Sequence, residues 1–372
     1  MHEKMIPGCS WSATALSTGQ SSAGNALRIL EQSGSLRYVE LPKTQRQKVP
    51  ALKAAIEDLK AGRLQAGWEK LEHHGVIKEV TDGVELRQRA MEQHLKAIRV
   101  GRTSLMISPR HEEARKVAAV VRQQLKAEGV ISAEDHAVTV LRRIDLGSEA
   151  RQDILHYAPG RVVGFHTRTA GGFKPGEKWT VREMNCESVM LECNGKVRQF
   201  KPSVTNGKWD VLVPSTIQVS VGDQIRVTGG FREGKNVFKN NDIVDVREIT
   251  HTELVLNDGR RMRRDGARID QGVCITSHAS QCRTVDQVVL LPDGADAKGW
   301  YVSLSRARYA MHVYTRDKAA LCKSVMHPGE RKSVWELLQA LRRSKPRSRG
   351  GMIPDLWAGR QAEIVRDVGM ER

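Results

Sequence analysis

A run of polar side chains stands directly before an apolar segment late in the chain. The stretch ITSHASQCRTVDQVVLL, residues 275–291, brings hydroxyl, imidazole and amide groups together and then turns abruptly hydrophobic. A packed core has no use for so many polar groups in a row, because each would need a hydrogen-bond partner there. Such side chains can hydrogen-bond phosphate and sugar oxygens without reading a base sequence. The run therefore predicts a polar binding segment that precedes a buried strand.

Two arginine-bearing stretches indicate a second kind of chemistry. YVSLSRAR, residues 301–308, contains Arg306 and Arg308, and TQRQ, residues 44–47, contains Arg46. A guanidinium group stays charged and binds two phosphate oxygens through parallel hydrogen bonds. Arg306 could bind a phosphate in this way; the alternative is that it is a solvated helix arginine that pairs with a carboxylate. For His278 the alternative is a core imidazole that hydrogen-bonds to the backbone.

The chain as a whole is strongly basic. Its 372 residues include 60 Lys and Arg against 43 Asp and Glu, which gives a formal net charge of +17. Such an excess is typical of proteins that bind a polyanion, and a merely basic soluble surface is the alternative. The six cysteines contain no C-x-x-C pair, so we expect a reduced, cytoplasmic protein without a metal site. No run of about eighteen apolar residues occurs in the sequence, and we expect no membrane span.

Strand and helix patterns alternate on both sides of a β-rich region. An apolar strand at residues 104–107 leads into a long helix with Glu112 and Glu113 in its first turn, where acidic groups complement the helix dipole. Such strand–turn–helix units build parallel α/β sheets. From about residue 158 to residue 271, short strands separated by Gly, Pro, Asn and Asp predict a small all-β barrel. The α/β pattern then returns with a helix that is expected to carry Arg306 and Arg308, followed by the strand AMHVYT.

Further elements are expected elsewhere in the chain. Three helices are predicted in PALKAAIEDLKAG, LQAGWEKLEHHG and DGVELRQRAMEQHLKAIRVG, each ending at a glycine. Near the N-terminus, the first twenty residues have no period. A short helix in AGNALRILEQSG, residues 23–34, and a strand over residues 36–41 are predicted to follow them. The basic stretch at residues 342–351 predicts a disordered tail.

These motifs, in this order, resemble those of one helicase family. TSHASQCRTVD and YVSLSRAR resemble motifs V and VI of superfamily-one helicases, and LPKTQRQ resembles motif IV of the branch that moves 5′ to 3′. Together with AGNALRILEQSG, GFKPGEKWTV and SVWELLQAL they are similar to the helicase portion of conjugative relaxase–helicases of the TraI/TrwC type. The resemblance runs from about residue 23 to residue 341. It implies an α/β fold, namely the second RecA-like domain of a P-loop helicase with an inserted small SH3-like β-barrel.

The resemblance also implies roles for single residues. In this family, motif V contacts single-stranded DNA and couples that contact to the nucleotide, while arginines of the second domain reach the γ-phosphate of ATP. The residues expected to contact DNA are Thr276, Ser277, His278, Ser280, Thr284 and His111. Those expected to be catalytic are Arg306, Arg46 and Gln281, and those expected to contact the nucleotide are Arg306, Arg46 and Arg308.

Aromatic side chains of the β-rich region have two possible roles. They can stack on bases of a bound strand, or they can pack the core of the small barrel. The side chains concerned are Phe165, Phe173, Trp179 and Phe231.

Two departures from the family pattern stand out. Cys282 occupies a position where the family has Gly, and Arg283 one where it usually has Lys; a glycine there normally serves a positive φ or a close approach of the backbone. The sequence also contains no phosphate-binding G-x-x-x-x-G-K-[ST] stretch, no acidic pair for Mg²⁺, and no relaxase tyrosines or three-histidine cluster. ATP and Mg²⁺ are therefore expected for the intact family enzyme but not as ligands of this chain alone.

The prediction from these observations is a truncated helicase segment of a conjugative relaxase. It would contribute single-stranded DNA contacts and arginine fingers to ATP-driven translocation in plasmid conjugation, with a separate relaxase or first RecA-like half as its partner. The alternative is a non-enzymatic single-stranded nucleic-acid-binding remnant or a pseudogene product. The expected parts are an atypical N-terminus at 1–22, the RecA-like domain at 23–160 and 272–330, the SH3-like insert at 161–271, and a helix with a basic tail at 331–372.

Overall fold

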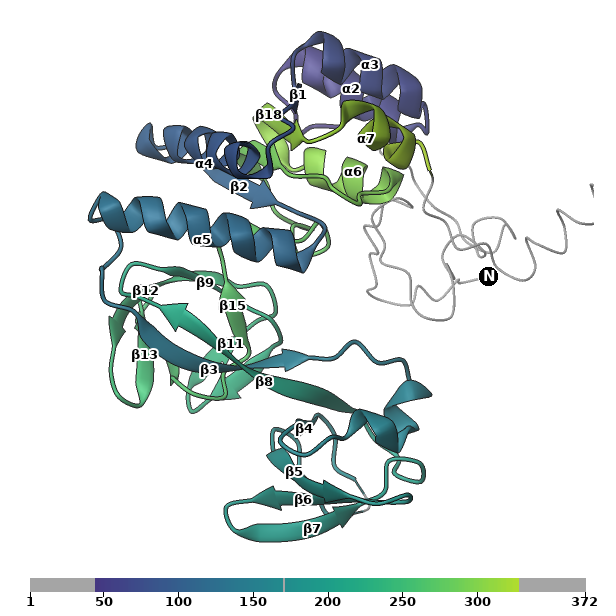
Figure 1. Cartoon of the computed structure of the whole chain (residues 1–372), viewed down its shortest axis with the longest axis vertical. Helices are drawn as coiled ribbons and strands as arrows, with labels where there is room; N and C mark the ends of the chain where they lie inside the picture. The colour runs from purple at the N-terminus through teal and green to yellow at the C-terminus, as the bar shows by residue number, and fades with distance from the viewer. Residues whose placement is uncertain (1–43, 170, 328–372) are drawn as a thin grey trace, which may run out of the picture.

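A computed structural model describes residues 44–169 and 171–327 (Figure 1). The expectations for the N-terminal segment at 1–22, the short helix in residues 23–34, the strand at 36–41 and the C-terminal part at 331–372 lie outside the described residues. Within the described ranges, no helix is long and apolar enough to cross a membrane.

A parallel sheet forms one end of the molecule. Its five strands come from both halves of the sequence and every neighbouring pair is parallel, in the order β1 (Ile77–Glu79), β18 (Ala307–Thr315), β17 (Val285–Leu290), β2 (Ser104–Ile107) and β16 (Cys274–Ile275). The strand predicted at residues 104–107 is therefore confirmed, and it lies inside the sheet between β17 and β16.

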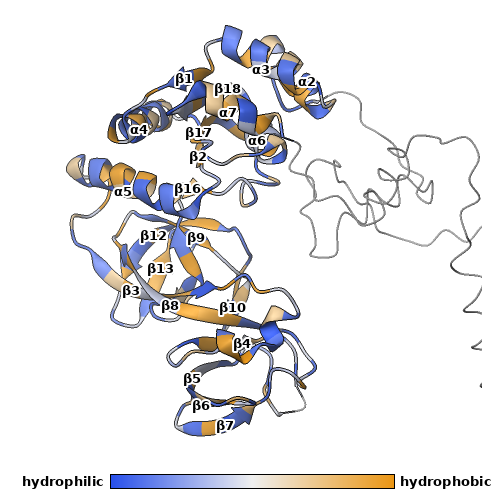
Figure 2. Ribbon diagram, turned by 45° about the vertical axis from the view of Figure 1, so that its right-hand side comes forward, coloured by the Kyte–Doolittle hydropathy of each residue, from blue (hydrophilic) through white to orange (hydrophobic). Residues whose placement is uncertain are grey.

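Helices cover both faces of this sheet and close two hydrophobic cores. The helices of one face are α2 (Pro50–Lys60), α3 (Leu64–His73), α6 (Ala297–Leu304) and α7 (Lys318–Val325), where Trp68 and Trp300 meet in a buried cluster. The other face carries α4 (Gly83–Arg99) and α5 (His111–Ala127). Figure 2 shows the amphipathic colouring of α5. The expected α/β class is confirmed, and a parallel sheet covered on both faces is the arrangement expected of a RecA-like domain.

One predicted helix boundary is wrong. The helix α6 ends at Leu304, so Arg306 lies in the turn after it and Arg308 lies on β18 rather than on the helix. The strand begins at Ala307 because this residue pairs with Val285 of β17. This pairing outweighs the helix preference of the Ala and Arg residues in the SRAR stretch.

The β-rich region consists of two antiparallel sheets and a hairpin. The six-stranded sheet has the order β3 (His136–Arg143), β8 (Trp209–Val219), β4 (Val162–Phe165), β5 (Lys178–Met184), β6 (Val189–Cys193) and β7 (Lys196–Phe200). The five-stranded sheet has the order β14 (Arg261–Arg263), β13 (Glu253–Leu256), β12 (Ile243–Ile249), β9 (Gln224–Val227) and β15 (Ile269–Gln271). The hairpin joins β10 (Phe231–Glu233) and β11 (Asn236–Phe238). The SH3-like nature of this region and the domain boundaries stay predictions.

The long strands β3 and β8 connect two separate hydrophobic cores of the β-rich region. Val138 of β3 and Ile217 of β8 pack with the five-stranded sheet, whereas Val211 of β8 packs into the second core (Figure 1). The second core holds most of the aromatic side chains in question, because Phe165, Phe173 and Trp179 are all buried there, while Phe231 stacks on Phe238. Phe165, Phe173 and Trp179 therefore pack the interior and are not exposed for base stacking, whereas Phe231 is half-buried.

Candidate functional site

The polar stretch after β16 is a connection, hereafter the motif V loop (residues 276–284). It starts where β16 ends, at the carboxyl edge of the sheet, and it leads into the start of β17, at the amino edge. Because β16 and β17 run in the same direction, the loop must pass along the full height of the sheet. The expectation that it precedes a buried strand is confirmed, since Val288, Val289 and Leu290 are fully buried.

Several polar groups of the loop hold the loop itself. The Ser280 hydroxyl is fully buried and donates to the Ser277 carbonyl at 2.6 Å. The Ser303 hydroxyl of α6 donates to Ser277 Oγ at 2.9 Å, and Ala279 N donates to Thr276 Oγ1 at 3.3 Å. His278 and Thr284 are exposed, whereas Thr276, Ser277 and Gln281 are half-buried. His278 and Thr284 are therefore the loop side chains best placed to meet a ligand.

Cys282 has a left-handed backbone, with φ of +65°. Such a φ crowds the Cβ of any L-residue and favours glycine. The cysteine is therefore held in this turn at a conformational cost.

Replacing Cys282 with glycine is expected to stabilise the fold. Cys282→Gly should raise the free energy of unfolding by roughly 0.5–1 kcal/mol, since relief of the left-handed strain exceeds the extra freedom of the unfolded chain. Urea unfolding measures the change, with Cys282→Ala as the control because it removes the thiol but keeps a Cβ. A glycine variant no more stable than the alanine variant would show that the turn is unstrained.

Two arginines meet at the amino edge of the sheet, where the motif V loop ends. Arg46 donates from Nη1 to the Ser305 carbonyl at 2.6 Å and from Nε to Thr284 Oγ1 at 3.0 Å. Arg306 is only 7% exposed and donates to the Val302 carbonyl at 2.8 Å and to Ser305 Oγ at 2.9 Å. Among the described residues, no carboxylate lies within 4 Å of either guanidinium. We call these two residues the arginine pair.

The electrostatics of the arginine pair favour an anion. Burial and, to a lesser extent, the charge of Arg46 lower the pKa of Arg306 to about 10, while Tyr301 and Cys282 act in the opposite direction. Burial also lowers the pKa of Arg46. Both groups still carry their positive charge at pH 7, so two cations stand together with little water to solvate them. A phosphate would relieve this repulsion through charge-assisted hydrogen bonds.

The sequence did not single out Gln47, which positions Arg46. Its buried amide donates to the carbonyls of Ser305 and Ala307, each at 3.0 Å, and Lys48 N donates to the Arg308 carbonyl at 2.8 Å. These bonds fix the segment before α2 against the start of β18. Both Gln45 and Gln47 lie in the TQRQ motif, but only the tertiary structure shows that Gln47 is the buried anchor and Gln45 is exposed.

Arg308 is not brought to the arginine pair. It is exposed on β18 and lies 3.8 Å from Asp286, a carboxylate that also accepts hydrogen bonds from Thr103. At the other end of the motif V loop, His111 at the start of α5 and Thr276 line a small recess. The predicted residues thus gather at two places, one at each edge of the sheet. No group of three or more side chains able to hold a metal ion occurs in residues 44–169 and 171–327.

Comparison with known proteins gives structural matches only. The chain is similar to a solved Pif1 helicase from Bacteroides in complex with ADP-AlF3 and ssDNA, at 13% identity and a TM-score of 0.30, covering 82% of this chain and 56% of that one. It is also similar to Pif1 helicase from Candida albicans, at 12% identity and a TM-score of 0.28, covering 80% and 60%. The chain thus spans little more than half of these proteins. No family model and no curated protein matches it.

Proposed function

We propose that this chain is the second RecA-like domain of a DNA motor and that it completes an ATP site held mainly by another domain. The observation that carries the proposal is the arginine pair, two partly buried guanidiniums without a carboxylate partner among the described residues. Such groups are suited to the γ-phosphate of a nucleotide bound by a facing domain. The conjugative role belongs to this proposal through the sequence resemblance.

The residues present fit one end of a nucleotide. ATP supplies the phosphoanhydride whose cleavage drives movement. Arg306 and Arg46 would bind the terminal phosphate, with Ser305 and Gln47 holding the arginines in place. Binding of the other phosphates and of Mg²⁺ is left to the facing domain, because the sequence has no G-x-x-x-x-G-K-[ST] stretch.

The motif V loop would connect the nucleotide to DNA. One end of the loop reaches Arg46 through Thr284, and the middle of the loop exposes His278. The loop also contacts α6, the helix that leads into Arg306, through Ser277 and Ser303. A strand that moves against His278 would therefore act on the same segment that holds the arginine pair.

A binding experiment tests the DNA half of this proposal. His278→Ala should weaken binding of a fluorescently labelled oligothymidylate by about three- to tenfold in anisotropy titrations, since one hydrogen bond to a charged phosphate is lost. The exposed His251, in the turn between β12 and β13, provides the matched control, and His251→Ala should bind as the wild type does. If the two variants bind oligothymidylate with equal affinity, His278 does not contact the DNA.

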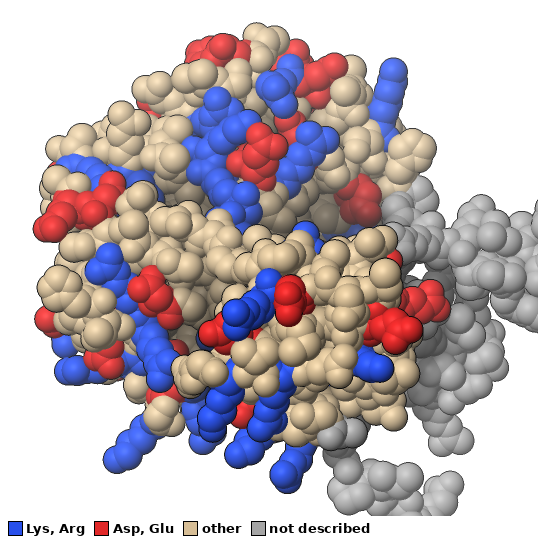
Figure 3. Space-filling view, turned by 60° about the horizontal axis from the view of Figure 1, so that its bottom comes forward, with Lys and Arg blue, Asp and Glu red and all other residues tan. Residues whose placement is uncertain are grey.

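The second candidate is a binding protein without turnover. Lys and Arg side chains gather along the lower edge of the face drawn in Figure 3, which suits a polyanion even without catalysis. This candidate predicts single-stranded DNA binding that is indifferent to Arg306→Ala and no ATP turnover with any first domain.

A further inference from the structure

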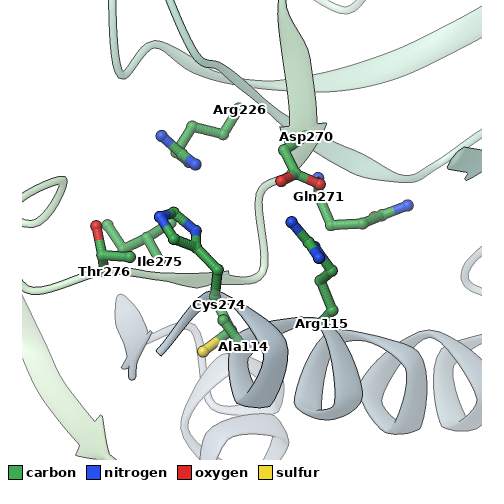
Figure 4. Close-up of a pocket in the computed structure, with 9 residues that line it drawn as sticks. Ala114, Arg115, Arg226, Asp270, Gln271, Cys274, Ile275 and Thr276 are labelled. Carbon is green, nitrogen blue, oxygen red and sulfur yellow. The ribbon is translucent and has the colours of Figure 1, made fainter. Parts of the chain in front are cut away.

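We propose that the recess between α5 and strands β9 and β15 is a second phosphate site, which takes a backbone phosphodiester of single-stranded DNA. The inference rests on the proposed DNA binding and adds a site at the opposite edge of the sheet from the arginine pair. The recess is lined by His111 and Arg115 of α5, Arg226 of β9, Asp270 of β15 and Thr276 of the motif V loop. Figure 4 shows the ends of Arg226, Arg115 and Asp270 gathered around this space.

Arg226 is the residue that indicates a ligand. It is 8% exposed; within the described part of the chain its Nε has no hydrogen-bond partner, and its Nη1 donates to the Asn241 side chain at 3.2 Å. No described carboxylate lies within 4 Å of it. Burial lowers its pKa, the charge of Arg283 lowers it further, and Asp270 acts against this. A buried arginine with an unused donor is costly, and an anion in the recess would satisfy it.

The charges around the recess are unbalanced. Asp270 is the one carboxylate that lines it; it accepts a hydrogen bond from Gln271 N at 3.0 Å and lies 3.6 Å from Arg142 of β3. Arg115 and Arg226 lie on the same recess, and burial together with these arginines lowers the pKa of His111. The two acids in the first turn of α5 are engaged elsewhere, Glu113 with Arg87 at 3.1 Å and Glu112 with Lys116 at 2.7 Å. An incoming phosphodiester would therefore meet an excess of positive charge.

The recess is tied to the motif V loop through Asn241. This residue, with φ of +68°, accepts from Arg226 at its side chain and from Arg283 of the loop at its backbone carbonyl. Because Arg226 and Arg283 share one anchor, a phosphate on Arg226 would be held beside the loop that leads to the arginine pair.

The sharpest test is a variant that should bind DNA more tightly. Asp270→Asn removes the competing negative charge and is expected to raise oligothymidylate affinity about three- to tenfold in anisotropy titrations. Glu192→Gln, on β6 of the far sheet, makes the same change in net charge where only an exposed pair with Arg182 is disturbed. If Asp270→Asn raises the affinity for oligothymidylate no more than Glu192→Gln does, the proposed site is wrong.

A loss variant tests the same site from the other side. Arg226→Met keeps the apolar stem and should lower affinity at least fivefold, with the log–log salt slope smaller by about 0.7, the value for one phosphate of a single strand. Circular dichroism confirms folding, and if this variant is unfolded the Asp270→Asn result decides alone. An unchanged slope in a folded Arg226→Met protein would contradict the proposal.

Two further results distinguish free phosphate from a DNA strand as the ligand, and distinguish failure of this site from failure of the proposed DNA binding. Inorganic phosphate, compared with chloride at equal ionic strength, should compete with the strand better in the wild type than in Arg226→Met, because both ligands would use Arg226, and the salt slope of the variant should be smaller. Selective competition in the wild type, with an unchanged slope in the variant, would make this a free-phosphate site and overturn the strand assignment. Failure of the wild type to bind oligothymidylate would refute the proposed DNA binding itself, whereas normal binding with unaffected Arg226 and Asp270 variants refutes only this site.

Discussion

In an ATPase rebuilt from this chain and a separately expressed first RecA-like domain of a relaxase–helicase, Arg306→Ala is expected to lower turnover by roughly 10³- to 10⁵-fold. The guanidinium is held by Val302 and Ser305 and is already desolvated, so its full charge would act on the transferring phosphate. Phosphate release in the presence of oligothymidylate measures the effect. Binding of DNA should change little, because the finger acts on the transition state.

The control for Arg306 is an arginine far from the arginine pair. Arg89 lies on α4, is exposed and pairs with Glu85 at 2.6 Å, so Arg89→Ala removes the same charge without touching the site. Turnover of the rebuilt enzyme should be unchanged in that variant. If Arg306→Ala and Arg89→Ala have the same turnover, the assignment of the finger is wrong.

Affinity for single-stranded DNA is expected to fall steeply with salt. Contacts with three or four phosphates give a log–log slope of about −2 to −3, so raising the salt from about 50 to 200 mM should weaken binding on the order of 20- to 50-fold. Anisotropy titrations over a salt series measure the slope. Mixed-sequence and oligothymidylate strands should bind within a few-fold of each other, because exposed His278 and buried Arg226 can meet phosphates but do not form a base-reading set.

The opposite result for DNA would be easy to recognise. Binding that is insensitive to salt, or that strongly prefers one sequence, would contradict contacts made mainly to the backbone. The proposed motor function would then lose its translocation path, since a strand that slides must be held without regard to its bases.

Local patterns predicted the elements that position the site. The apolar run at β2, the acidic first turn of α5 and the glycine-ended helices α2, α3 and α4 follow directly from periodicity and capping signals. The burial of the strand after the motif V loop was equally visible in the sequence. The sequence also singled out Cys282 as a position where a glycine could serve a positive φ, and its backbone does have a positive φ.

The sequence could not predict which distant segments contact each other. Gln47 and Ser305 are joined only because the segment before α2 lies beside the start of β18. Arg226, Asp270 and Arg115 come from three stretches separated by many residues, and nothing in their local patterns predicts a shared recess. The sequence predicted Arg306 and Arg308 on a helix because SRAR has no strand pattern of its own. The strand starts at Ala307 because this residue pairs with Val285 of β17, which lies far from it in the local pattern.

Titration of the separately expressed first RecA-like domain with this chain tests the central claim most directly. The quantity to measure is ATP turnover in the presence of oligothymidylate. We predict that neither protein alone exceeds background by much, that turnover rises and saturates as the chain is added, and that Arg306→Ala protein saturates binding without restoring turnover. Turnover by the purified chain alone, or no rise at any concentration although the two proteins bind each other, would contradict the proposal that this chain completes the ATP site of a DNA motor.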